Sequence, residues 1–142
     1  MHLRFRQAAL LALMAWIGIA GAPAVAANVV QPVHQLRIYE VHGGNEQPFH
    51  HRFRDHALRI MARHDFNVLA TWEARSGERT EFVYLLEWPD EATMKARWAS
   101  FMADQEWAEI KKQTGQAHGR FVDGIQDRTL RLTDYSPGTL GR

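Results

Sequence analysis

The sequence of 142 residues contains no cysteine. That absence excludes disulfide bonds, a thiolate nucleophile, a thiolate metal site and attachment of a lipid to a cysteine. A domain formed by this chain must therefore be stabilised by packing and hydrogen bonding alone.

Long apolar runs are also missing, because the longest, Ala8–Ala20, has 13 residues. A helix of that length is too short to cross a hydrocarbon core of about 30 Å. The run follows the basic residues Arg4 and Arg6 and precedes Ala24-Val25-Ala26, the small-residue pattern that a signal peptidase requires. Residues 1–26 are predicted to be a signal peptide cleaved after Ala26, with an uncleaved membrane anchor as the alternative. We expect a periplasmic or secreted protein that has no membrane contact after cleavage.

An excess of either charge is absent from the predicted mature chain. Cleavage removes two of the 17 basic residues and leaves 15 against 16 acidic ones, a formal charge of −1. Arginines alternate with acidic residues and do not form the basic stripe that phosphate binding requires, so we expect no nucleic-acid partner. The remaining 116 residues fit one compact domain.

Metal-binding spacings are missing as well, although the chain has eight histidines. No His-x-x-x-His pair exists, and the neighbours His50 and His51 point about 100° apart on a helix. His50 and His64 lie about 21 Å apart along a helix, too far to share an ion. We expect no metal and no cofactor; a single axial histidine for haem remains an alternative. The spacings also indicate no Ser-His-Asp arrangement, glycine-rich phosphate loop or carboxylate pair.

Arg52–Glu73 is the most informative stretch, because a helical pattern changes there into a strand pattern. The apolar face of the predicted helix consists of Phe49, Phe53, Ala57 and Ile60, with Met61 at its edge. Asp55 and Arg59 are expected to pair across one helical turn on the opposite face. From Phe66 the period becomes two and places Phe66, Val68, Ala70 and Trp72 on one side of a strand.

Strands are also predicted at His34–Val41, where Leu36 and Ile38 alternate with Arg37 and Tyr39, and at Glu81–Trp88. In the latter, Phe82, Tyr84, Leu86 and Trp88 face one way while Val83 and Leu85 face the other. Because both faces are apolar, we expect helices on one and a second copy of the sheet on the other. The alternative is a locally apolar outer face.

The second helical region is predicted to begin at the N-cap Asp90 and to be broken before a further helix capped by Asp104, with Gly115 as its end. Its buried stripe is Met94, Trp98, Phe101 and Met102. A fourth strand is expected within Phe121–Leu132.

The element order is thus β-α-β-β-α-β, a ferredoxin-like α+β fold with helices on one face of a four-stranded antiparallel sheet. The predicted divisions are a leader at 27–33, the domain at 34–137 and a tail at 138–142.

Several groups of residues between Gln35 and Pro137 resemble the NIPSNAP family. They are Leu36-Arg37-Ile38-Tyr39-Glu40, Arg52-Phe53-Arg54-Asp55-His56, His64, Trp72, Val83-Tyr84-Leu85-Leu86, Trp98 with Phe101, Asp104 with Trp107, and Thr133-Asp134-Tyr135-Ser136-Pro137. The resemblance implies a dimeric α/β barrel fold and a homodimer. Two positions depart from the family pattern: His42-Gly43-Gly44-Asn45-Glu46 replaces a Pro-Gly-Lys-like turn, and Asp65 follows His64 where members usually carry glycine. Asp65 must therefore adopt a helix-end conformation that glycine accepts more easily.

The candidate catalytic residue is His56, at the border of the apolar helix face, because histidine titrates near neutral pH. A semi-buried histidine is more often a structural hydrogen-bonding residue, and this interpretation is favoured for His56, so no catalytic residue is assigned. A cavity between helix and sheet is predicted, with ligand-binding residues Tyr39, His56, Trp72, Tyr84 and Trp98. Three functions remain open: a domain that binds a small apolar or aromatic molecule, a cofactor-independent monooxygenase- or isomerase-like enzyme, and a structural or partner-binding dimer.

Overall fold

The structure is a computed structural model that describes residues 31–138. The predicted signal peptide at 1–26, the leader up to residue 30 and residues 139–142 of the tail lie outside that range.

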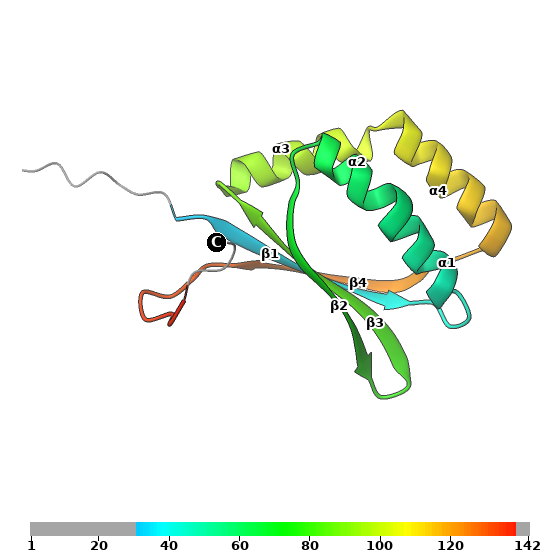
Figure 1. Cartoon of the computed structure of the whole chain (residues 1–142), viewed down its shortest axis with the longest axis horizontal. Coiled ribbons are helices and arrows are strands. Elements are labelled where there is room, and N and C mark those ends of the chain that lie inside the picture. The colour runs from blue at the N-terminus through cyan, green and yellow to red at the C-terminus, as the bar shows by residue number, and fades with distance from the viewer. Residues whose placement is uncertain (1–30, 139–142) are drawn as a thin grey trace, which may run out of the picture.

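Four strands form one antiparallel sheet in the order β2-β3-β1-β4. In chain order the elements are β1 Val33–Val41, α1 Glu46–His51, η1 Arg52–Ala57, α2 Leu58–Arg63, β2 Asn67–Ser76, β3 Arg79–Trp88, α3 Glu91–Met102, α4 Gln105–His118 and β4 Val122–Leu130. All helices lie on one side of the sheet (Figure 1). The predicted ferredoxin-like β-α-β-β-α-β fold is therefore confirmed.

Two aspartates begin the helices of the second helical region, as predicted. Asp90 accepts a hydrogen bond from the backbone N–H of Thr93 at 2.6 Å, and Asp104 accepts one from Trp107 at 2.9 Å. The predicted end of α4 at Gly115 is wrong. The helix continues to His118 and ends at Gly119, whose φ of 75° is the left-handed conformation that glycine adopts without strain.

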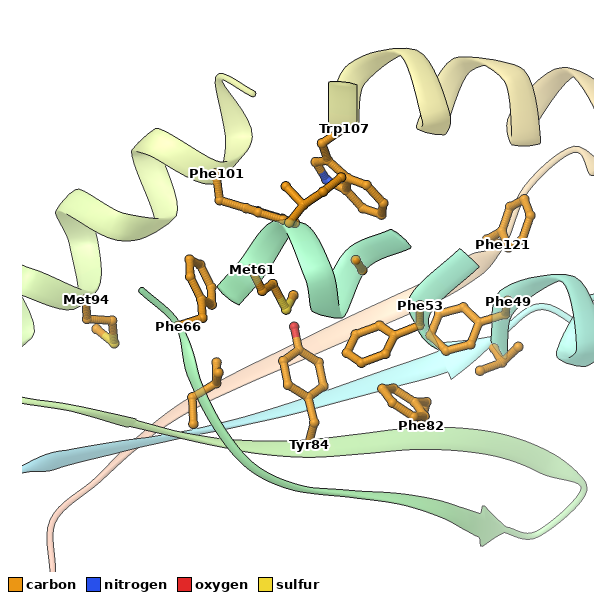
Figure 2. Close-up of a cluster of buried hydrophobic side chains, with 14 of the residues drawn as sticks. Phe49, Phe53, Met61, Phe66, Phe82, Tyr84, Met94, Phe101, Trp107 and Phe121 are labelled. Carbon is orange, nitrogen blue, oxygen red and sulfur yellow. The ribbon is translucent and has the colours of Figure 1, made fainter. Parts of the chain in front are cut away.

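The apolar face predicted for the first helix is buried: Ile60 is fully buried, and Phe49, Phe53, Ala57 and Met61 are at most 6% exposed. They pack with Phe82 and Tyr84 of β3 and with Phe66, Phe101 and Trp107 (Figure 2). The predicted Asp55–Arg59 pair is wrong. Asp55 pairs with Arg54, its chain neighbour, while Arg59 extends to Glu106 at the start of α4.

The first helix has a π-helical segment, η1, between its two α-helical parts α1 and α2. The N–H of Leu58 donates to the carbonyl oxygen of Phe53, five residues earlier. Since a π turn contains more residues than an α turn, each residue rotates by a smaller angle, and a wheel drawn at 100° per residue misplaces side chains beyond the segment.

Strand β2 contains a β-bulge between Val68 and Ala70. Val68 lies opposite Leu86, but beyond Leu69 it is Thr71 that lies opposite Tyr84, and Trp72 lies opposite Val83. One extra residue moves every later side chain to the other face. The prediction that Trp72 shares a face with Val68 is therefore wrong.

The sheet face away from the helices is apolar at its centre. Leu36 lies opposite Leu85, and Ile38 opposite Val83, so these four side chains share that outer face. At its margins Trp72 is 49% exposed and Leu130 39% exposed. Within residues 31–138, no helix is long and apolar enough to cross a membrane.

Candidate functional site

A cavity of about 230 Å³ lies between the helices and the β1–β4 side of the sheet. Its lining comes from β1, β4 and all the helical segments. The residues are Arg37, Tyr39, Phe49, Arg52, Phe53, Ala57, Met61, Trp98, Phe101, Met102, Trp107, Lys111, Val122 and Ile125. By comparison, an apolar cavity of about 150 Å³ can hold benzene.

Aromatic rings dominate the cavity wall, with Tyr39, Phe49, Phe53, Trp98, Phe101 and Trp107 all contributing. Two apolar lining side chains are instead open to solvent, since Met102 and Ile125 are each 55% exposed. The predicted burial of Met102 in the helix stripe is wrong. Exposed apolar side chains on the lining of an aromatic cavity are typical of a small-molecule entrance.

A chain of hydrogen bonds joins the cavity to the core. Arg37 Nη2 donates to the hydroxyl of Tyr39 at 3.1 Å, and this hydroxyl lies 2.8 Å from that of Tyr84. Tyr84 is fully buried and rises from β3 toward Met61 (Figure 2). The pKa of Tyr84 is raised well above its usual value, mainly by burial and secondly by the neighbouring Tyr39. Its hydroxyl therefore remains protonated near neutral pH.

Gln35 connects the hydrogen bonds of Arg37, Tyr39 and Tyr84 to two tryptophans. Its Oε1 accepts from the indole N–H of Trp98 at 2.7 Å and from that of Trp88 at 3.2 Å. Its Nε2 donates to both carboxylate oxygens of Asp127 at 2.9 Å, and Asp127 also forms a salt bridge with Arg37. Trp98 and Arg37 are thus held in fixed orientations at the cavity wall.

Arg52 of η1 enters the lining from the other side. Its guanidinium carbon lies 3.7 Å from the ring centre of Phe121 and 5.8 Å from that of Trp107. Its Nη1 donates to Thr114 Oγ1 at 3.3 Å. Burial lowers the pKa of Arg52, because a desolvated charge is less favourable than a hydrated one.

Only two of the five predicted ligand-binding residues, Tyr39 and Trp98, line this cavity. Tyr84 lies behind its wall and contacts it through the Tyr39 hydroxyl. Trp72 lies on the outer face because of the bulge in β2. A single cavity lined by His56, Trp72 and Tyr84 is therefore not present among residues 31–138.

His56 lines a neighbouring groove between the first helix and α4, together with His51, Arg52, Thr114 and His118. Arg52 therefore borders both this groove and the aromatic cavity. His56 is half-buried and points to the neighbouring helix, not to the sheet. The expected position at the border of the apolar face assumed a regular α-helix, whereas His56 lies inside the π-helical segment. In the described part of the chain, no three histidine or acidic side chains are grouped to hold a metal ion.

Ser100, His64 and Asp104 form a hydrogen-bonded row that the sequence spacings did not indicate. His64 Nδ1 lies 2.8 Å from Ser100 Oγ, and His64 Nε2 lies 2.8 Å from Asp104 Oδ2. Asp104 also caps α4 and binds Arg63. None of the three side chains lines the aromatic cavity or the His56 groove. Because the row joins the end of α2 to Ser100 of α3 and to the N-cap of α4, we interpret it as a connection between α2 and the α3–α4 junction.

Sequence reasoning missed the charged residues of the cavity lining, Arg37, Arg52 and Lys111. It also missed Gln35 and Asp127, which lie behind the lining and hold Trp98 and Arg37. One signal was present for Arg37, since it shares a strand face with Tyr39 two residues later. The pattern could not show that this face, and not that of Leu36 and Ile38, is the one that the helices cover.

The solved structures similar to this chain include three NIPSNAP proteins. An uncharacterised NIPSNAP-like domain protein from Burkholderia xenovorans is 19% identical, with a TM-score of 0.65 over 80% of this chain and 97% of that one. A NIPSNAP family protein from Agrobacterium tumefaciens is 20% identical, with a TM-score of 0.65 over 75% and 98%. Another from the same organism, of unknown function, is 16% identical, with a TM-score of 0.65 over 76% and 94%.

A comparison with curated protein sequences gives no match. The NIPSNAP family model matches residues 34–137, most of the chain and nearly all of its described part. This match agrees with the resemblance carried by the strand and helix motifs. The chain belongs to the NIPSNAP family.

Proposed function

We propose that this NIPSNAP domain binds a small apolar or aromatic molecule in the cavity between its helices and sheet. The observation that carries the proposal is the aromatic lining of a space of about 230 Å³ with two exposed apolar side chains, Met102 and Ile125, on its wall. Natural ligand sites combine such an apolar wall with a few fixed polar groups. Arg37, Arg52 and the Tyr39 hydroxyl supply those groups here.

Binding is favoured over catalysis by the chemistry of the lining. No histidine, aspartate or glutamate is among the residues of the cavity wall. Histidine and the carboxylates are the side chains that serve most often as the general base of an enzyme, and the lining offers only Tyr39 and Lys111 besides its arginines. His56, the candidate for that role, lies in the other groove. A purely structural function is disfavoured, because a domain that binds no ligand would be more stable if its own side chains filled this space.

The experiment compares a cavity-filling substitution with a matched control. Ala57 is 1% exposed and lines the cavity, whereas Ala62 is exposed on the same helix. Ala57→Leu should abolish tryptophan fluorescence quenching by a two-ring aromatic compound, and Ala62→Leu should not. Met102→Trp, at an exposed lining position, provides a second test if Ala57→Leu fails to fold. Equal quenching in all four proteins would overturn the proposal.

We also propose that the domain is exported and forms a homodimer through its outer sheet face. The basic start, the short apolar run and the cleavage pattern ending at Ala26 support export to the periplasm or outside the cell. The apolar strip of Leu36, Ile38, Val83 and Leu85 supports the dimer. Intact mass of the protein from its own host tests export, and a mature chain that begins at Met1 would contradict cleavage.

A further inference from the structure

We infer that the ligand of this cavity is an anionic aromatic molecule, a compound of one or two rings bearing a carboxylate, whose negative group is bound by Arg52. The inference rests on the proposed function, because it concerns the same cavity. It adds the charge of the ligand and the residue that recognises it.

The charge of the lining is all of one sign. Three of its side chains are cationic, Arg37 from β1, Arg52 from η1 and Lys111 from α4, and none is acidic. A neutral aromatic ligand would gain only cation–π contacts from three cations around an aromatic space. A carboxylate there would bind charged donors in surroundings of low dielectric constant, where charge-assisted hydrogen bonds are strong.

The three cations differ in whether a carboxylate already neutralises them. Arg37 forms a salt bridge with Asp127. Arg52 has no salt bridge among residues 31–138; its contacts are a hydroxyl and two aromatic rings. Lys111 likewise has only a ring contact, with its Nζ 5.8 Å from the centre of Trp107. The charge of Arg52 is therefore available to a ligand.

Arg52 is also held in place before any ligand arrives. Its guanidinium lies 3.7 Å from the ring centre of Phe121, and Thr114 fixes one of its nitrogens. Burial desolvates the charge of Arg52 and therefore lowers its pKa. A bound anion would offset the free-energy cost of this desolvation. A planar guanidinium with fixed orientation can bind a carboxylate through two parallel hydrogen bonds.

A second buried donor belongs to Arg37. Its Nε is buried and has no hydrogen-bond partner within the described chain. An unsatisfied buried donor is rare, so the hydrogen bonding of Arg37 is incomplete in the part of the chain that the structure describes. The aromatic part of the ligand would lie among the rings of Phe49, Phe53 and Trp98.

The test uses two ligands of equal shape, 2-naphthoate and its uncharged counterpart 2-naphthamide, titrated at neutral pH by tryptophan fluorescence. We expect the carboxylate to bind at least about tenfold more tightly than the amide. Arg52→Gln should remove this preference, and Arg52→Lys should keep part of it. Arg54→Gln is the matched control, because Arg54 lies on the same helical segment with its side chain 65% exposed.

The outcomes show whether the inference fails alone or together with the proposed function. If the amide binds as tightly as the carboxylate, the cavity is an apolar site and the anion inference is wrong. If the preference survives in Arg52→Gln, Arg52 is not the recognising group. If Ala57→Leu leaves naphthoate binding intact, the anion binds outside this cavity. If neither compound binds at millimolar concentration, the proposed function fails together with the inference.

Discussion

The hydroxyl of Tyr39 lies 2.8 Å from that of Tyr84 and joins a half-buried residue of the cavity wall to a fully buried residue of the core. Arg37 donates to the same Tyr39 hydroxyl. The two rings meet edge to face, with centres 5.4 Å apart. Movement of the Tyr39 ring within the cavity would therefore break a hydrogen bond in the core.

The first prediction is a coupling between these two tyrosines. Because the hydroxyl pair is removed from water, a double-mutant cycle of Tyr39→Phe and Tyr84→Phe should give an interaction free energy of about 0.5 to 1.5 kcal/mol. Urea denaturation of the four proteins measures it. A cycle of Tyr39→Phe with Tyr135→Phe is the control, since Tyr135 is 82% exposed. Equal values for the two cycles would show that the hydrogen bond adds no stability.

The second prediction concerns Asp65, the only non-glycine residue of the described chain with a positive φ, at 58°. The expectation that it adopts a helix-end conformation suited to glycine is confirmed. Asp65→Val should lower the free energy of unfolding by about 1 to 2 kcal/mol, because a β-branched side chain is strained there. Asp65→Gly keeps the backbone unstrained and should cost only its effect on the unfolded chain and the loss of the carboxylate.

Loss of the Asp65 carboxylate needs its own control, because Asp65 Oδ2 forms a salt bridge with Arg97 Nη2 at 3.0 Å. Arg97→Gln removes that pair and leaves the backbone unchanged. Its effect on the free energy of unfolding should stay below about 1 kcal/mol, as for other exposed pairs. If Arg97→Gln and Asp65→Val destabilise equally, the ion pair and not the backbone explains the change.

The sequence predicted the elements that follow local rules. Asp90 and Asp104 were identified as N-caps because a carboxylate before a helix accepts its free N–H groups, whatever lies elsewhere in the fold. The apolar face of Phe49, Phe53 and Ile60 was identified because burial follows the periodicity of a helix. These features depend on residues within one or two turns.

The lining of the candidate site could not be predicted from such local rules, because two irregularities decide which side chains reach it. The extra residue in β2 moves Trp72 to the outer face, and only the partner register of β3 reveals it. His56 likewise lies within the π-helical segment, where the regular spacing of 100° per residue does not hold. Neither feature has a marker in the sequence, since each depends on packing between elements distant in the chain.

The third prediction concerns acid stability. The pKa of Glu106 is lowered from its usual value of 4.5 to about 2, mainly by the hydrogen bond from Arg59 and secondly by that from Arg63. Because the folded-state pKa is depressed, Glu106 contributes stability that is complete above about pH 4.5 and is lost as the pH falls through about 2. Glu106→Gln lacks that contribution at every pH.

The measurement is the free energy of unfolding of both proteins between pH 7 and pH 2. Their difference should be constant at neutral pH and should shrink as the pH falls toward 2. Glu109→Gln is the control, because the Glu109 carboxylate lies 3.9 Å from Lys112 and outside the arginine cluster. A difference independent of pH would contradict the proposed cause.

The last prediction concerns the proposed homodimer. Val83 lies on the outer face of β3, opposite Ile38 of β1 and Trp72 of β2, at the centre of the apolar strip. If two sheets pack face to face there, Val83→Lys buries an unpaired charge in the interface and should convert the dimer to a monomer. An obligate interface of this kind buries about 2,000 Å² or more, so the unsubstituted protein should be dimeric at micromolar concentration.

Light scattering after size-exclusion chromatography measures both states. Ala99→Lys is the matched control, because Ala99 is exposed on α3, on the helix side of the sheet, and its substitution should leave the dimer intact. A monomer before any substitution would contradict the proposal directly. A Val83→Lys protein that stays dimeric would place the interface on another surface, because an uncompensated buried lysine at the centre of the strip is incompatible with tight sheet packing.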